Sequence, residues 1–352
     1  MNAAWIQSLR QRLFASWVDA AITLVCLYMV WRISVPLVHW LVLDATWNGT
    51  TREDCKGSGA CWVFVRVRFG QFMYGQYPLP ERWRVDIVGA LWLAVTAALA
   101  WRGLPYRRSA TFAAAVLLPS VGVVLLHGGW GTGLRLVETR EWGGLMLTLF
   151  LTIYAGLIAI PLGVLLALGR RSRLPLVRLG SVIFIEFWRG VPIITVIFLA
   201  SLLLPLIMPT GFDVDRLARA VIGLAFVIAA YMAEAVRGGL QALPDGQAEA
   251  AEALGLGYWR IQRTIVLPQA LRIALPAMTN EFIALFKNTT LVLIVSIFDL
   301  LGIAQAALAD PAWVGMNMEA YVFAGAIYWF ACFGLSQWSR SREKRLQKAY
   351  GR

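Results

Sequence analysis

An uncharged apolar run from residue 142 to residue 169 most constrains what this chain can fold into. A run of about 20 apolar residues is long enough to cross a bilayer as an α-helix. Lipid offers no hydrogen-bond partner to the backbone, so a spanning segment must satisfy its own N–H and C=O groups. Similar apolar segments recur along the chain. We therefore predict an all-α polytopic membrane protein with about eight transmembrane helices. They are expected at residues 18–43, 85–101, 110–126, 142–169, 179–208, 217–235, 277–301 and 320–338.

The composition agrees with this class. Hydrophobic residues make up 59% of the chain and charged residues 15%, whereas soluble domains carry about 25% charged residues. The net charge of +12 comes mainly from Lys and Arg residues in short loops between the apolar segments. That pattern orients membrane proteins with their basic loops in the cytoplasm. The sequence contains no basic element of the kind that contacts bases in a groove of DNA, so we expect a lipid membrane as a partner and no nucleic acid.

The distribution of basic residues also predicts the topology. Eight spans place both termini on one side, and the basic clusters after the second, fourth, sixth and eighth spans share that side, which is therefore the cytoplasm. The loop at 44–84 is an exception, because it carries six Lys or Arg residues and yet falls outside. A different number of spans within residues 1–138 is the alternative.

One mostly polar stretch interrupts the apolar pattern at residues 249–268, EAAEALGLGYWRIQRTIVLP. Its first helical piece ends near Leu254, and Gly255 follows where a helix ends, because glycine takes positive φ without penalty. The second piece is expected at 258–266 and ends at Pro268, which cannot continue a hydrogen-bonded helix. A short helix of this kind is too short to be stable alone and can dock into a groove on another protein.

This stretch resembles the EAA signature of the membrane subunits of ABC-type importers. The signature's spacing is met by Glu249-Ala250-Ala251, then Gly255, then Ile265, Leu267 and Pro268. Flanking residues resemble the polar amino-acid branch of that family: Glu186, Arg189, Gly190, Pro192, Glu234, Arg237, Gly238, Gly239, Gln269–Arg272, Asn280 and Lys287–Leu291. The resemblance covers residues 139–340 and implies a type I importer permease core of five helices. Three extra helices precede this core, and a basic cytoplasmic tail follows at 341–352.

The N-terminal part, residues 1–138, carries a resemblance of its own. Three motifs in or beside its loop at 44–84, Gly59–Trp62, Phe72–Gly75 and Glu81–Val85, are similar to the longer-loop permease subunit of general L-amino-acid uptake systems. This similarity implies an inner-membrane protein of broad amino-acid selectivity. It also implies a heterodimer with a second, related permease subunit.

The resemblance gives the cytoplasmic segment 238–276 a specific role, that of a coupling loop which rests in a surface groove of a cytoplasmic ABC ATPase dimer. It implies that Glu249 meets basic groups of the ATPase and that Gly255 allows the tight turn. The groove would be filled by Ala250, Ala251 and Leu254. An ordinary cytoplasmic helical hairpin is the alternative.

The chain contains no GxxxxGK[ST] segment, so it cannot cradle ATP phosphates in the usual way. We therefore expect no enzyme and no cofactor bound by this chain, with ATP used by the separate ATPase. The family also implies a periplasmic amino-acid-binding protein as a partner. Asp299, Asp310 and Trp313 are expected on the outer side, where they are candidates for its docking surface; a solvated loop is the alternative.

Polar side chains within predicted spans are candidates for the substrate path, because ionisable groups in a membrane are functional by default. These candidates are Lys287, Asn288, Thr290, Asn280 and Glu186. Structural ion pairs near a cytoplasmic gate are the alternative for Glu186, Arg189, Glu234 and Lys287. Arg237 lies at the membrane edge and is expected to anchor the coupling loop.

The cysteines and histidines predict at most one disulfide and no metal site. Cys55 and Cys61 lie in the same loop, and outside the cytoplasm they can form a disulfide; two free thiols are the alternative. The two histidines are far apart in the sequence, so no metal site is expected.

We thus predict the channel-forming subunit of an ATP-driven importer that moves L-amino acids into the cytoplasm. The competing hypothesis is an ion-coupled secondary transporter that works alone. It requires inverted repeats and ion ligands near the midplane of the membrane, and it leaves the signature at 249–268 unexplained.

Overall fold

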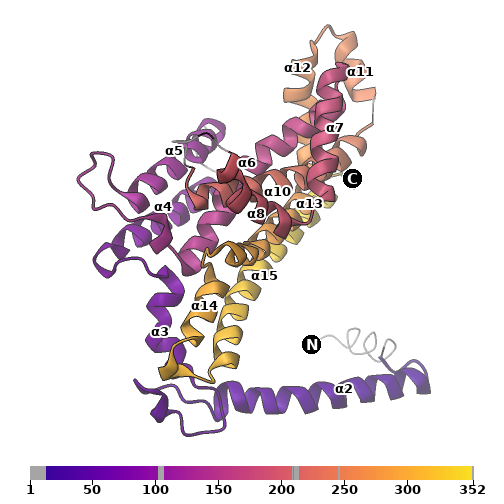
Figure 1. Ribbon diagram of the computed structural model, residues 1–352. Helices are drawn as coiled ribbons and strands as arrows, with labels where there is room; N and C mark the ends of the chain where they lie inside the picture. Colours follow the sequence, from indigo (N-terminus) through magenta and orange to yellow (C-terminus); the bar gives the residue numbers. More distant parts are fainter. Residues whose placement is uncertain (1–12, 102–106, 208, 210–213, 245, 351–352) are drawn as a thin grey trace. The chain divides into compact units, whose positions relative to one another are not determined.

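The computed structural model describes residues 13–101, 107–207, 209, 214–244 and 246–350 (Figure 1). Regular structure in these ranges is helical, which confirms the predicted all-α class. The α-helices are α2 (Trp17–Val38), α3 (Trp62–Tyr74), α4 (Arg82–Ala100), α5 (Arg107–His127), α6 (Gly144–Arg170), α7 (Pro175–Gly190), α8 (Ile193–Phe198), α9 (Leu204–Ile207), α10 (Arg216–Gln241), α11 (Gly246–Ala253), α12 (Tyr258–Ile261), α13 (Leu267–Asn288), α14 (Leu300–Leu308) and α15 (Asn317–Tyr350).

Six helical segments among the described residues are long and apolar enough to cross a membrane, or up to seven if one bent pair counts as a span. Among the described residues this is one or two fewer than the predicted count of about eight. The difference lies at 85–101, within α4, whose first turns carry Arg82, Arg84 and Asp86. These charges interrupt the apolar character of the start of α4.

The bent pair corrects the predicted span 179–208, which is not one continuous helix. α7 ends at Gly190, and α8 begins at Ile193 after a bend of 102°. Val191 has extended backbone, as expected for a residue before proline, and Pro192 lacks the N–H that a continuing helix would need. A π-helical segment, Leu199–Leu203, then joins α8 to α9.

The predicted span 277–301 is also divided. α13 begins earlier, at Leu267, and ends at Asn288, where a 3₁₀-helix continues to Val295. Ser296 then has left-handed backbone with φ 58°, and Asp299 begins α14 by accepting the N–H of Gly302 at 2.9 Å. The chain therefore turns within the predicted span, and α13 is continuous with part of the predicted coupling loop 238–276.

The residues form two compact units, Met1–Arg68 with Leu308–Val322, and Phe69–Ala307 with Phe323–Arg352. The boundary expected at 138–139 concerns the extent of the family core and stays a prediction. In the first unit, α2 begins with a capping box in which Asp19 N–H donates to Ser16 Oγ at 3.1 Å and Ser16 N–H donates to Asp19 Oδ2 at 3.2 Å. This is the S-x-x-D pattern that starts helices.

The expected loop 44–84 is not all loop, because the apolar stretch of α3 forms a helix within it. α3 and the residue before it are tied to residues 308–322 by three contacts. Arg68 pairs with Asp310, and the rings of Phe64 and Trp313 lie 5.5 Å apart. Cys61 N–H donates to the Glu319 carboxylate at 3.0 Å. Two segments far apart in the sequence thus share one packed unit.

The structure joins Cys55 and Cys61 in a disulfide within this unit. Just before it, the backbone N–H groups of Thr51 and Thr50 donate to the Asp54 carboxylate and hold its pKa below the ordinary value. The short chain between the two cysteines is therefore bounded on one side by a hydrogen-bonded turn.

We expect Cys55 and Cys61 to resist thiol labelling in the native membrane protein. In a variant with Cys26→Ala and Cys332→Ala, a maleimide polymer should react only after reduction, because both remaining thiols are in the disulfide. Closing so short a loop contributes about 2 kcal/mol to the unit's stability. Labelling of both thiols without a reductant would contradict the bridge.

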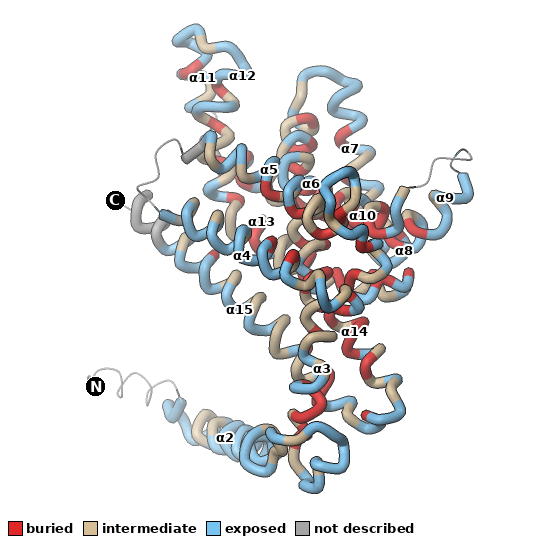
Figure 2. Tube along the Cα trace, turned by 90° about the vertical axis from the view of Figure 1, so that its left-hand side faces the viewer, coloured by how far each residue is buried: buried red, intermediate tan, exposed pale blue. Residues whose placement is uncertain are grey.

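In the second unit, α10 is the central helix and packs against α6, α13, α7 and α8. Figure 2 shows buried positions concentrated along α6 and α10. Close packing depends on small residues: a Cβ atom at Gly163 of α6 would lie 2.6 Å from Met232 Cβ and 3.0 Å from the Ala229 carbonyl oxygen. α6 and α10 therefore touch along their backbones, as membrane helices with small interfacial residues do.

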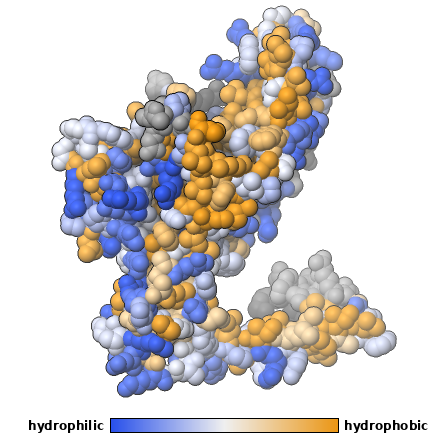
Figure 3. Space-filling model, in the orientation of Figure 1, coloured by the Kyte–Doolittle hydropathy of each residue, from blue (hydrophilic) through white to orange (hydrophobic). Residues whose placement is uncertain are grey.

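Apolar side chains also cover part of the outer surface of this unit, and Figure 3 shows them over α8 and α9. The exposed residues there include Ile194, Phe198, Leu202 and Leu206. In a multi-pass membrane protein such a surface meets lipid or another membrane subunit rather than water.

Candidate functional site

The stretch at 249–268 forms a helical hairpin at one end of the second unit (Figure 1). α11 ends at Ala253, and Gly255 takes positive φ of 77°. Across the turn, Gly255 N–H donates to the Glu252 carbonyl at 2.9 Å and Leu256 N–H donates to the Ala251 carbonyl at 3.2 Å. These bonds satisfy the last carbonyl groups of α11, which would otherwise lack partners.

The second helical piece does not stop at Pro268, so that expectation was wrong. α12 passes into a π-helical segment, Gln262–Val266, which leads directly into α13. Pro268 occupies one of the first two positions of α13, where a missing N–H costs little. The hairpin is consequently continuous with a long helix of the core. Gln269 Nε2 also donates to Gln247 Oε1 at 2.7 Å, which ties α13 to α11.

The hairpin has an inner and an outer side. Ala251 is 4% exposed and packs in one cluster with Ile261 and Val266. The expectation that Ala251 fills a partner's groove is therefore not met, because its side chain lies inside the hairpin. Leu254, by contrast, is 82% exposed, and both Glu249 and Ala250 are exposed.

Two aromatic side chains that sequence reasoning did not single out extend this outer side. Trp259 is 71% exposed and Tyr258 is 51% exposed, and their rings lie 5.3 Å apart. Exposed aromatic residues are typical anchors of protein interfaces. Their position directly after Gly257, beside the glycine turn, was the available indication in the sequence.

A cluster of charged side chains lies where α6, α7 and α10 come together. Glu234 is at its centre: Oε1 accepts from Arg170 at 2.8 Å, and Oε2 accepts from Arg237 Nη2 at 2.6 Å. Arg189 lies 3.8 Å from Glu234, and Glu186 accepts from Arg170 at 3.1 Å. This set of five residues, called the Glu234 cluster below, carries three positive and two negative charges.

The geometry of the Glu234 cluster favours the ion-pair interpretation of Glu186, Arg189 and Glu234 over direct contact with a solute. Sequence reasoning missed Arg170, because an arginine directly after an apolar span was interpreted as a determinant of orientation. Arg237 donates to both Glu234 and Gln241. It thus links the cluster to the end of α10, from which the hairpin follows.

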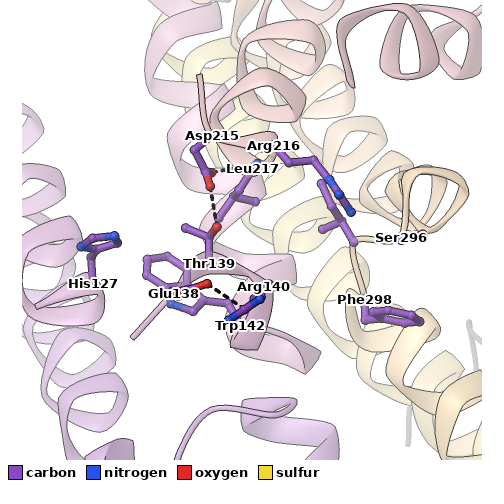
Figure 4. Close-up of a pocket in the computed structure, with 11 residues that line it drawn as sticks. His127, Glu138, Thr139, Arg140, Trp142, Asp215, Arg216, Leu217, Ser296 and Phe298 are labelled. Atoms are coloured by element: carbon purple, nitrogen blue, oxygen red, sulfur yellow. Dashed lines mark hydrogen bonds and ion pairs between the residues drawn. The ribbon is translucent and has the colours of Figure 1, made fainter. Parts of the chain in front are cut away.

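A cavity of about 400 Å³ opens beside the first turn of α10 (Figure 4). Its polar groups are largely paired with one another. Arg140 donates to Glu138 at 2.7 Å, and Asp215 accepts from Thr139 at 2.6 Å and from the N–H groups at the start of α10. The pocket was not predicted from the sequence. With its acids already bonded, we assign it no part in transport.

Comparison with known proteins identifies the family. Residues 159–348, more than half of the chain, match the family described as binding-protein-dependent transport system inner membrane component. The chain belongs to this family.

Two relatives of this permease match it along almost its whole length. The chain is 51% identical over 96% of its length to the inner membrane amino-acid ABC transporter permease protein YhdY of Escherichia coli K12, and it covers 91% of that protein. It is 35% identical over 97% of its length to BztC of Rhodobacter capsulatus, a glutamate/glutamine/aspartate/asparagine transport system permease protein, and it covers 94% of BztC.

A solved structure agrees. The chain is similar to the crystal structure of an amino acid ABC transporter with histidines, with 32% identity and a TM-score of 0.51. The similarity covers 57% of this chain and 92% of that one. The permease is thus the membrane subunit of an amino-acid ABC importer, in the inner membrane, as the signature at 249–268 predicted.

Among the described residues, the remaining predicted residues of the permease make no hydrogen bond or ion pair with the Glu234 cluster. Lys287 and Asn288 end α13. Thr290 is the second residue of the 3₁₀-helix, and its hydroxyl donates to the Lys287 carbonyl at 2.9 Å. Lys287 and Asn280 are exposed. Within the described residues no ion pair reaches Lys287, so the ion-pair alternative does not extend to this residue.

Two candidates for an outer docking surface are buried instead. Asp299 is fully buried and accepts from Tyr328 at 2.7 Å in addition to capping α14. Trp313 is 4% exposed and packs on Phe64. Asp310 is already paired with Arg68. All three hold the local structure together, so a docking role for them has no geometric support.

Proposed function

We propose that this permease moves L-amino acids into the cytoplasm and that the hairpin at 249–268 couples it to a separate ABC ATPase. The observation that carries the proposal is the two-sided hairpin. Ala251 and its neighbours hold the hairpin together, while Glu249, Leu254 and Trp259 are presented outward. A carboxylate beside exposed apolar side chains suits a groove that combines basic and apolar groups.

The connections of the hairpin support a path for force into the membrane. Closure of the ATPase dimer would displace the outer side of the hairpin. Because the hairpin continues into α13 without a break and bonds back to it through Gln247 and Gln269, α13 would move with it. The Glu234 cluster would keep α6, α7 and α10 together during this movement.

The other partners follow from the family and from the relatives. The family description supports a binding protein that delivers the solute, and we infer a heterodimer with a second, related permease. Positive charge in the loops supports cytoplasmic termini. The name of BztC supports polar and acidic amino acids, so L-glutamine is a suitable probe of uptake. Carriage of the solute through contacts with Asn280, Lys287, Asn288 or Thr290 stays a prediction.

A matched pair of substitutions tests the coupling role. Leu254→Glu adds a charge to the outer side of the hairpin and should reduce co-purification of the ATPase at least tenfold, with the melting temperature unchanged. Ala251→Glu adds the same charge to the inner side, where an unpaired buried carboxylate costs about 3 kcal/mol, and should lower the melting temperature. Full retention of the ATPase by the Leu254→Glu variant would contradict a coupling surface there.

The stand-alone transporter is tested by reconstitution. The wild-type permease alone, in proteoliposomes with an ion gradient and without an ATPase, should not accumulate L-glutamine. Uptake under these conditions would refute the proposed function in favour of ion-coupled transport.

A further inference from the structure

Arg219, in the first turn of α10, is a buried arginine whose guanidinium has no hydrogen-bond or ion-pair partner among the residues that the structure describes. It is 8% exposed, and neither Nε nor Nη1 has a hydrogen-bond partner. Three other buried or partly buried arginines of this unit have acidic partners: Arg84 pairs with Glu81, and Arg170 and Arg237 pair with Glu234. An unpaired buried charge is costly, so Arg219 requires an explanation.

The face of α10 that bears Arg219 packs towards an irregular part of the fold. Gly223, four residues further along, shares this face, and a Cβ atom there would lie 3.4 Å from Ala200 Cβ and 3.6 Å from Val196 Cγ1. These two residues belong to α8 and to the π-helical segment Leu199–Leu203. Single π-helical turns inside helices often mark functional sites.

That same π-helical segment contains a second polar group without a partner. Ser201 is 3% exposed, and its hydroxyl makes no hydrogen bond within the described part of the chain. Serine in a helix ordinarily bonds a carbonyl of the preceding turn. A guanidinium and a hydroxyl are therefore both buried and both unsatisfied, on elements that pack together.

The surroundings are of the kind that transporters use to bind solutes. α8 follows the break at Val191–Pro192 and packs against α10 and against the 3₁₀-helix Thr289–Val295, which itself interrupts the predicted span. Interrupted helices that meet inside a bundle form the solute sites of many transporters. Arg219 lies at the end of α10 opposite the hairpin, where a solute released by a binding protein would enter.

The planar fork of a guanidinium fits a carboxylate with two parallel hydrogen bonds. A carboxylate is also the anion that all L-amino acids have in common. We propose that Arg219, with Ser201 as a second donor, binds the α-carboxylate of the transported amino acid. The proposal rests on the proposed function, and it explains why a group that must release its ligand in every cycle has no permanent partner in the chain.

The test uses the complete importer, with the second permease, the ATPase and the binding protein, in proteoliposomes with L-glutamine as the probe. In Arg219→Met we expect uptake to fall at least tenfold, while ATP hydrolysis stimulated by the loaded binding protein stays within twofold of wild type. Arg219→Lys keeps the charge and should recover part of the uptake. Ser201→Ala should lower uptake less than Arg219→Met. Arg216→Met removes an exposed arginine of the same turn and serves as the matched control.

Each outcome decides. Wild-type uptake by Arg219→Met would overturn the proposal. If the Arg219→Met variant loses the second permease on purification, the proposal is also overturned, because the guanidinium then belongs to a subunit interface. If uptake and ATP hydrolysis fall in parallel, the proposal is overturned as well, because the guanidinium then serves the conformational change. If the wild-type importer itself fails to move any L-amino acid, the proposed function fails and the carboxylate site fails with it.

Discussion

Replacing Gly255 by valine should abolish uptake, although nothing stands in the way of the new side chain. No atom lies within 4 Å of a Cβ built at this position, so the effect comes from the backbone alone. Gly255 has φ of 77°, a conformation in which a β-branched residue is strained by about 1–3 kcal/mol. α11 has only eight residues and is not stable without its turn. The outer side of the hairpin would consequently lose its shape.

Gly257→Val is the matched control, since it places the same side chain two residues away in the same exposed turn. Gly257 has φ of −71° and extended backbone, which any residue adopts, and its Cβ position is also open. We expect normal membrane insertion of both variants, with uptake of L-glutamine and stimulated ATP hydrolysis lost only in Gly255→Val. Equal activity of the two variants would show that the turn conformation has no part in coupling.

The hairpin illustrates what can be predicted from the sequence. The glycine turn and the two helical pieces follow from local rules, because Gly255 and the short polar stretch leave few alternatives. Which side of α11 is buried does not follow from these rules. Ala250 and Ala251 are chemically identical, and only the return of Ile261 and Val266 after the turn decides that Ala251 lies inside.

The membrane spans show a similar limit. Long apolar runs identify α2, α5, α6, α10 and α15, because nothing else satisfies their backbone in lipid. The break after Asn288 was not located, since no glycine or proline lies between Asn280 and Ser296 to mark it. Interactions between spans are harder still. Glu234 and Arg170 lie 64 positions apart, and only the packing of α6 against α10 brings them together.

Glu234→Gln should have the largest effect on the core of the permease. The substitution keeps the shape of the side chain and removes its charge, so that Glu186 is the one acid left within the Glu234 cluster to balance Arg170, Arg189 and Arg237. The Glu234 side chain is only 17% exposed, and removing one partner of such a pair leaves uncompensated charge. We expect a loss of about 3 kcal/mol in the free energy of unfolding and at least a tenfold loss of uptake.

Glu186→Gln is the control within the same cluster. Its side chain is 55% exposed and makes a single contact with Arg170 at 3.1 Å, and exposed pairs contribute about 0–1 kcal/mol. Thermal unfolding of the purified importer and uptake of L-glutamine should therefore remain near wild type in this variant. A structural role predicts that the loss of uptake is larger for the more buried carboxylate with more bonds. If both variants lose uptake equally with unchanged melting temperatures, the two carboxylates act on the solute or the gate and do not support the helix packing.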